Sequence, residues 1–214
     1  MEKKFHFAVT LRIFLIPVLM TGSLFIFAQN PREPSAFRYG NQTEFAVSFG
    51  LGNIKTDVVN NIQLHAKNDE IIINLQTING VRIQQKAFLG IGVGVEKWQY
   101  GWFYPVFAHL SYNLKPTDNT FYGALNIGSS IGTRDSTSFF HAGKGAFMIS
   151  IGIGYKMKVA KKLQFLYEIF YKYQAIKSDY SIILIDSTNT RKTISNIDYT
   201  VPYNFVGFKI GISY

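Results

Sequence analysis

His109 and Ser111 are the residues of this sequence whose types and spacing come closest to a catalytic pair. They stand two positions apart in a stretch, 105–112, where apolar and other side chains alternate. Because successive side chains of a strand point to opposite faces, both would share one face, as a serine nucleophile and its histidine base must. Glu168 is only a nominal acidic partner, so we predict that the pair is structural and that the protein is not an enzyme.

Charged side chains occupy the same face of the expected strands: Glu96, Lys156, Glu168, Lys172 and Lys209. That face otherwise carries mostly glycine and small polar residues, and a charge buried there is tolerated only when it is paired. We predict that Glu168 pairs with an inward basic residue, first of all with Lys209 on the next strand. Glu96, His109, Glu168, Lys172 and Lys209 are therefore expected to form a structural polar cluster, and the sequence identifies no ligand-binding residue.

Nucleotide and metal sites are poorly supported. Gly90, Gly92 and Gly94 alternate inside an apolar run, whereas a dinucleotide loop requires G-x-G-x-x-G between a strand and a helix. The histidines lack metal-ligand spacing, and the chain contains no cysteine. We therefore expect neither a cofactor nor a metal.

The C-terminal stretch, 205–214, shows what kind of sheet the chain forms. Large apolar residues fall on one face: Val206, Phe208, Ile210, Ile212 and Tyr214. The other face is mostly Gly and Ser with one Lys, instead of the charges that a water-soluble sheet would expose. This arrangement suits the crowded interior of a narrow barrel whose outside touches lipid.

Seven more stretches alternate in the same way before the last one. The expected strands are 43–53, 70–82, 87–96, 103–114, 120–131, 146–157, 163–176 and the closing stretch. We place a turn at 83–86 in preference to a hairpin at Asn79-Gly80. The longer connections are 55–69, the aromatic loop 97–102, 132–145, and 178–202, which could extend the last two strands. They alternate with short turns at 83–86, 115–119 and 158–162, as in a transmembrane barrel.

Composition and the N-terminus agree with an exported membrane protein. The chain has 16% aromatic and 16% charged residues, which is poor in charge for a globular protein. Basic residues precede an apolar run at 13–27, so residues 1–28 read as a cleaved signal peptide, the alternative being an uncleaved anchor helix. We expect an extended leader at 29–42 and a barrel at 43–214. Interfacial aromatic residues are expected near strand ends: Trp98, Tyr100, Trp102, Tyr104, Tyr203 and Tyr214.

Several pieces of the chain resemble the small bacterial outer-membrane β-barrel-domain family, of the OmpX and OmpA-transmembrane type. They are 78–82 (INGVR), 89–94 (LGIGVG), 105–112 (PVFAHLSY) and the closing strand. The resemblance implies location in the bacterial outer membrane, and a terminal assembly signal in Phe208, Ile210, Ile212 and Tyr214. It implies outer-membrane lipid, lipopolysaccharide and the barrel-assembly machinery as partners. These motifs carry architecture and no activity.

The expected fold is all-β, an eight-stranded antiparallel up-and-down transmembrane barrel that follows a cleaved N-terminal signal peptide. We expect a structural or surface-interaction role, with loops 132–145 and 186–198 contacting an extracellular or envelope protein partner. A narrow channel or small-ligand transporter, a lipid-modifying enzyme using His109 and Ser111, and a soluble lipocalin-like binding barrel remain as alternatives. The formal net charge of +9 does not indicate nucleic acid, which an exported chain rarely meets.

Overall fold

The chain folds into strands along most of its length. The computed structural model describes residues 37–58, 62–84, 86–99, 101–133, 144–185 and 191–214, except for the side chains at 55–66, 133, 144, 146, 178–185 and 191–199. The elements are β1 (Phe37–Leu51), β2 (Asn53–Val58), β3 (Ile62–Lys67), β4 (Ile71–Ile83), β5 (Ala87–Trp98), β6 (Gly101–Asn113), β7 (Thr120–Thr133), β8 (Lys144–Ala160), β9 (Leu163–Ile185) and β10 (Arg191–Ser213). In the described part of the chain, no helix is long and apolar enough to span a membrane.

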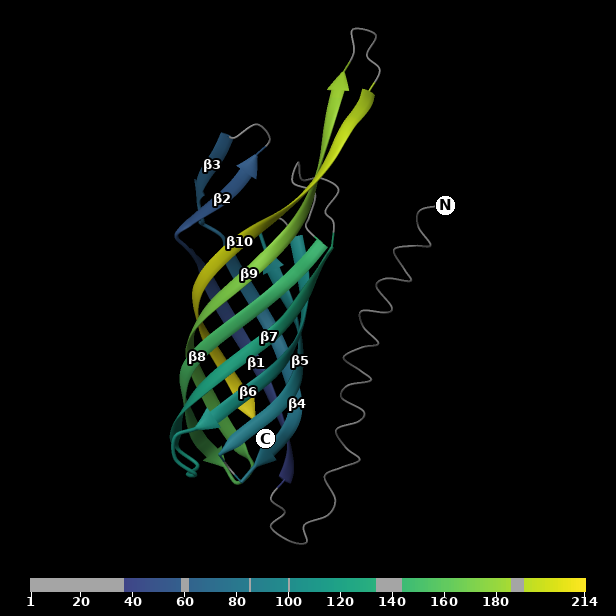
Figure 1. Ribbon diagram of the computed structural model, residues 1–214. Coiled ribbons are helices and arrows are strands. Elements are labelled where there is room, and N and C mark those ends of the chain that lie inside the picture. The colour runs from purple at the N-terminus through teal and green to yellow at the C-terminus, as the bar shows by residue number, and fades with distance from the viewer. Residues whose placement is uncertain (1–36, 59–61, 85, 100, 134–143, 186–190) are drawn as a thin grey trace. The chain divides into compact units, whose positions relative to one another are not determined.

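Eight of these strands close into one antiparallel barrel (Figure 1). Its order is β1-β10-β9-β8-β7-β6-β5-β4, so strands adjacent in the chain pair with one another. The separate β2–β3 hairpin is inserted between β1 and β4, which nevertheless pair from Phe37↔Ile83 to Phe49↔Ile71. The prediction of an all-β, eight-stranded, up-and-down antiparallel barrel is confirmed.

Apolar side chains cover the outside of the barrel. Along the last strand Phe208 is 59% exposed and Ile210 is 55% exposed, whereas Phe205 and Lys209 between the outward positions are buried. The same alternation holds on β4, where Ile71 and Leu75 point out and Ile72 and Asn74 between them are buried. An exposed apolar face around a closed barrel is stable against lipid and unstable in water. A lipocalin-like barrel with its apolar face inside does not fit these strands.

Glycines on the inner face make room for large neighbours on the paired strand. Gly207 lies opposite Phe170, and a Cβ added to it would come within 2.7 Å of the Phe170 ring. Gly92 lies opposite Phe107, where an added Cβ would come still closer to the ring. The interior is therefore packed with large residues beside glycines.

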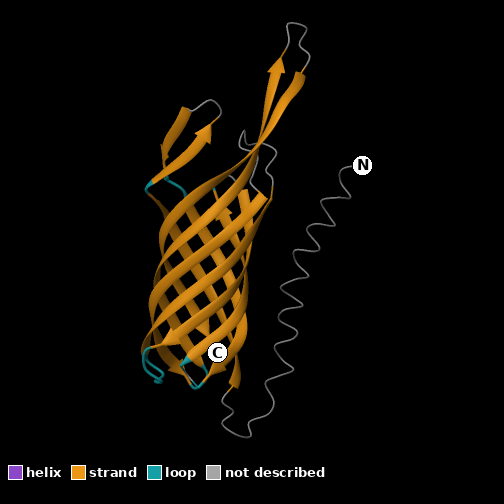
Figure 2. Ribbon diagram, in the orientation of Figure 1, coloured by secondary structure: helices purple, strands orange, loops and turns teal. Residues whose placement is uncertain are grey.

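The two ends of the barrel differ. One end carries tight connections, such as the turn after β4, where Lys86 N–H donates to Ile83 C=O at 3.0 Å and Gln84 has a φ of 47°. The opposite end carries the β2–β3 hairpin and the prolonged ends of β9 and β10 (Figure 2). The turn predicted at 83–86 is present, because β4 ends at Ile83 and β5 begins at Ala87.

Several predicted boundaries are wrong. Residues 37–42 of the predicted leader belong to β1, because their backbone pairs with β4. The loop predicted at 55–69 contains β2 and β3, which pair with each other. The aromatic loop at 97–102 is nearly all strand, since β5 runs to Trp98 and β6 starts at Gly101. Residues 191–198 of the predicted loop 186–198 form the start of β10, paired with β9, so the alternative that 178–202 extends the last two strands is the correct one.

Some expectations fall on parts of the chain that the structure does not describe. The signal peptide at 1–28, its cleavage and residues 29–36 of the leader lie outside the described residues. So do Tyr100, residues 134–143 of the loop predicted at 132–145, and residues 186–190.

Candidate functional site

The candidate site is a network of buried polar side chains inside the barrel. At its centre Lys209 of β10 lies between two carboxylates. Its Nζ is 2.8 Å from Oε1 of Glu168 on β9 and 3.4 Å from Oε2 of Glu44 on β1. The pair expected between Glu168 and Lys209 is present, because the two residues are direct register partners on neighbouring strands.

Neutral side chains also donate hydrogen bonds to these two carboxylates. The Tyr122 hydroxyl donates to Glu168 Oε2 at 3.0 Å, and Gln76 Nε2 donates to Glu44 Oε2 at 2.6 Å. Every member of this group is nearly inaccessible to solvent. Hydrogen bonds of this kind offset part of the cost of burying charge, which a bare ion pair does not recover.

A second ion pair crosses the lumen nearer the hairpin end. Lys172 of β9 donates to Glu96 Oε1 on β5, although these strands are not neighbours in the barrel. Glu96 also accepts from Asn74 Nδ2 at 2.9 Å and from Trp98 Nε1 at 3.3 Å. This bridge ties opposite walls of the barrel together.

Apolar clusters lie beside the charged layers. Trp98 packs against Phe103 and Phe205, with ring centroids 5.0 Å and 5.3 Å away, together with Ile72 and Ile176. Tyr203 packs on the same cluster. Trp98 and Tyr203 were expected at the membrane interface; Trp98 instead lies inside, because β5 continues past Glu96 and keeps Trp98 on the inward side.

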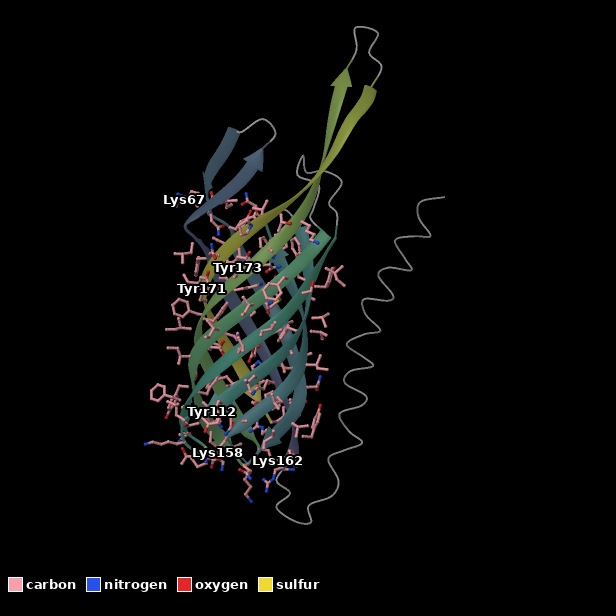
Figure 3. All side chains as sticks on the ribbon, viewed as in Figure 1. Lys67, Tyr112, Lys158, Lys162, Tyr171 and Tyr173 are labelled. Atoms are coloured by element: carbon pink, nitrogen blue, oxygen red, sulfur yellow. The ribbon has the colours of Figure 1, made fainter. Side chains whose placement is uncertain are left out.

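The remaining aromatic residues of the predicted interface lie in different places. Trp102 and Tyr214 are exposed, 44% and 45%, and Tyr104 is half-buried. The residues of the predicted assembly signal, Phe208, Ile210, Ile212 and Tyr214, all face outward. Tyr112 and Tyr171 project from the outer wall at different heights (Figure 3).

His109 and Ser111 do lie on the inner wall, both buried. His109 Nδ1 is 2.6 Å from Asn126 Oδ1, its register partner on β7. Ser111 Oγ accepts from Lys156 Nζ at 3.5 Å, and the Lys156 ammonium lies 4.6 Å from the centroid of the Tyr122 ring. Glu168, the nominal acidic partner, forms an ion pair with Lys209 and accepts a hydrogen bond from Tyr122. His109 and Ser111 therefore have different hydrogen-bond partners, Asn126 and Lys156.

Several members of the network were not singled out from the sequence, among them Tyr122, Glu44, Gln76 and Arg82. Glu44 and Gln76 alternate with outward apolar residues on β1 and β4, so the period-two pattern already put them inside. Arg82 donates from Nη1 to Gln164 Oε1 at 3.1 Å and from Nη2 to Ser213 Oγ near the turn end. Arg82 lies in the predicted strand 70–82 with the same parity as Gln76, so the same pattern also put it inside.

A small polar cluster where β1 pairs with β4 was also not predicted from the sequence. Asn41 Nδ2 donates to Asn79 Oδ1 at 2.8 Å and to Thr77 Oγ1 at 3.3 Å, and the Tyr39 hydroxyl donates to Asn79 Oδ1. Polar groups on a lipid-facing wall are tolerated when they satisfy one another. The apolar exterior is thus interrupted near the turn end without leaving these groups unpaired.

Within the described residues, no group of three or more His, Cys, Asp or Glu side chains is placed to hold a metal ion. The ion pairs and hydrogen bonds of the lumen network neutralise buried charge and fill space inside the barrel. Three buried carboxylates, Glu44, Glu96 and Glu168, face Lys172 and Lys209.

Comparison with known proteins supports the architecture. No family model matches the chain, and no curated protein matches its sequence. Among solved structures, the solid-state NMR structure of outer membrane protein AlkL in DMPC lipid bilayers is similar, with a TM-score of 0.50 and 15% sequence identity. The similarity covers 82% of this chain and 88% of that chain. The chain thus has the fold of an eight-stranded outer-membrane β-barrel, while the resemblance to the OmpX and OmpA type stays a prediction.

Proposed function

We propose that this protein is a bacterial outer-membrane barrel with a structural or surface-interaction role, and not an enzyme or a pore. The observation that carries the proposal is an apolar outer wall around an interior filled by ion pairs and aromatic rings. The apolar wall requires lipid. The filled interior supports neither a solute path nor an accessible reactive group.

The end that carries the β2–β3 hairpin and the prolonged β9–β10 ribbon is the surface that would meet a partner. Long loops of outer-membrane barrels lie on the extracellular side, whereas short turns lie in the periplasm. Strands that continue past the barrel present backbone and side chains beyond the lipid. Lipopolysaccharide or an extracellular or envelope protein would be the partner of this end, and the assembly machinery would read the last strand.

Cell fractionation followed by SDS gels of heated and unheated samples tests the proposal. We expect the protein in the outer membrane and a change of mobility on heating, because a folded barrel resists detergent. Sequencing the N-terminus of the membrane form should find Gln29 as the first residue. Recovery of the protein in the periplasm or the medium would overturn the proposal.

Two alternatives have direct tests. A channel would give stepwise currents in a planar bilayer, where we expect none from this protein. A lipid-modifying hydrolase would release fatty acid from outer-membrane lipid and lose that activity on Ser111→Ala. We expect no release by the parent protein, because Ser111 is closed off inside the barrel and bonded to Lys156. Release that disappears in the variant would replace the proposed role by the enzymatic one.

A further inference from the structure

An open apolar groove of about 730 Å3 crosses the outer wall over β6, β7, β8 and β9 and reaches Val206 of β10. One row along it contains Leu110, Leu125 and Ile151, which are register partners on β6, β7 and β8. The next row contains Tyr112 and Ile153, and the position between these two is Gly123. The missing side chain at Gly123 leaves open space between Tyr112 and Ile153.

Neither the backbone nor the packing requires a glycine at this position. The φ of Gly123 lies outside the left-handed region that favours glycine, and an added Cβ would come no closer than 4.0 Å, to the Gly152 carbonyl oxygen. Gly92 and Gly207 differ, since their added Cβ atoms would collide with aromatic rings. An apolar side chain would fit at Gly123 on this lipid-facing wall. Because the position has none, the open space can be filled by a group from outside the chain.

The groove runs obliquely up the barrel. Strands of such barrels tilt by roughly 35–45° from the barrel axis, so a row of register partners climbs through the membrane thickness. Leu114 lines the groove at the turn end, and Tyr171 lines it farther up. Figure 3 shows Tyr112 nearer that end than Tyr171, with both rings on the outside. This direction suits an extended hydrocarbon chain that starts at the membrane surface.

Lysines gather where the groove meets the turn end. Exposed lysines lie in the turn after β6 (Lys115), near the end of β8 (Lys158) and in the turn after β8 (Lys161 and Lys162), and the two turns contain one acid, Asp118. Lys158 Nζ is 2.6 Å from Asp118 Oδ2, and Lys158 N–H donates to Asn119 Oδ1 at 2.8 Å, so the end of β8 is held to the turn after β6. Lys158 and Lys162 lie at this end of the barrel in Figure 3. Basic side chains just beyond an apolar wall attract anionic headgroups.

We propose that the groove binds one acyl chain of an anionic phospholipid, whose headgroup phosphate is held by Lys115 and Lys158. The inference rests on the proposed location in a membrane. A second copy of the chain is a poorer occupant. Two copies inserted in the same orientation would pack this wall with their lysine-rich turns at the same depth, and like charges would repel.

Native mass spectrometry of the folded protein tests the inference with dimyristoyl-phosphatidylglycerol and dimyristoyl-phosphatidylcholine as probes. We expect one phosphatidylglycerol to survive detergent removal and phosphatidylcholine to be lost. Gly123→Leu should abolish retention by filling the groove. Ala108→Leu is the matched control, because Ala108 is also a small outward residue but does not line the groove.

The headgroup contacts are tested separately. Lys115→Gln and Lys158→Gln should each weaken retention of phosphatidylglycerol by about fivefold, from the attraction that one lysine contributes near an anionic surface. Lys67→Gln, at the opposite end of the barrel, should change nothing (Figure 3). A heated and unheated gel of every variant shows whether it has folded.

Equal retention of both lipids, or retention that persists in folded Gly123→Leu, would overturn the inference. A dimer that Gly123→Leu dissolves would overturn it as well and make the groove an interface between copies. These outcomes can be distinguished from failure of the proposed function. A barrel in the outer membrane that retains no lipid would contradict only this inference, whereas a protein found outside membranes would contradict both.

Discussion

Lys209 and Glu168 are direct cross-strand partners on β10 and β9, and their Nζ and Oε1 atoms lie 2.8 Å apart inside the barrel. Glu44 approaches the same ammonium from β1, on the other side of β10. One lysine therefore joins the last strand to both of its neighbours, at the seam where the barrel closes.

Lys209→Met should destabilise the barrel by about 3–5 kcal/mol, because it leaves two buried carboxylates without their cation. The free energy of unfolding, measured by urea titration in detergent micelles, checks this. Adding Glu168→Gln should recover part of the loss. Lys158→Met is the control, since its pair with Asp118 is exposed and should contribute about 0–1 kcal/mol. Equal effects at the two lysines would contradict the role assigned to Lys209.

Gly92→Ala should destabilise the barrel by about 1–3 kcal/mol, because the new methyl group collides with the Phe107 ring. Combining it with Phe107→Leu should relieve the collision, so that the two changes are not additive in urea unfolding. Gly123→Ala, on the outer wall with open space at its Cβ, should stay within about 0.5 kcal/mol of the parent. A Gly92→Ala protein as stable as the parent would show that the inner glycines are not needed for packing.

Trp98 and Trp102 should respond differently to quenchers in lipid. Trp98 is 4% exposed inside the barrel, whereas Trp102 is 44% exposed on the outer wall. In vesicles containing brominated phosphatidylcholine, Trp98→Phe, which keeps Trp102, should lose fluorescence several times more strongly than Trp102→Phe. The chain has no other tryptophan, so each variant reports one site. Strong quenching of Trp98 would place it on the lipid side.

The prolonged ribbon of β9 and β10 should be separable from the barrel. Asp179 and Asp198 are register partners, so deleting residues 180–197 and joining the strands by an Asn-Gly turn keeps the remaining pairs aligned. We expect the shortened protein to insert and to shift on heated gels like the parent. Cross-linking on intact cells should then lose the proteins captured by the parent. Unchanged capture would move the partner surface elsewhere.

The sequence by itself divided the side chains of each strand into two faces, one of large apolar residues and one of mostly small or polar residues. Phe208 and Ile210 alternate with Gly207 and Lys209, and a strand of period two leaves no other assignment once the small-residue face is taken as the inside. The ion pair of Lys209 and Glu168 could also be predicted from the sequence, because the two residues lie on strands that are consecutive in the chain and therefore neighbours in the barrel.

Local pattern did not decide where strands begin and end. The strand ending predicted at Glu96 left Trp98 in a loop, although Trp98 has the same parity as Glu96 and packs inside when the strand continues. The β2–β3 hairpin was missed because the stretch 55–69 is polar. A hairpin that lies outside the core needs no apolar face, so its strands lack the alternation that predicts the barrel strands.

Only the tertiary structure decided the contacts that cross the lumen. Glu96 and Lys172 lie on strands that do not touch, and their meeting depends on the shift in register that accumulates around the closed barrel. Gly123 shows the same limit on the outer wall. Its alternation marks it as outward, but the groove it opens exists only when Tyr112 and Ile153 are brought to either side of it by pairing between strands. Period two is a property of each strand, whereas closure is a property of all eight together.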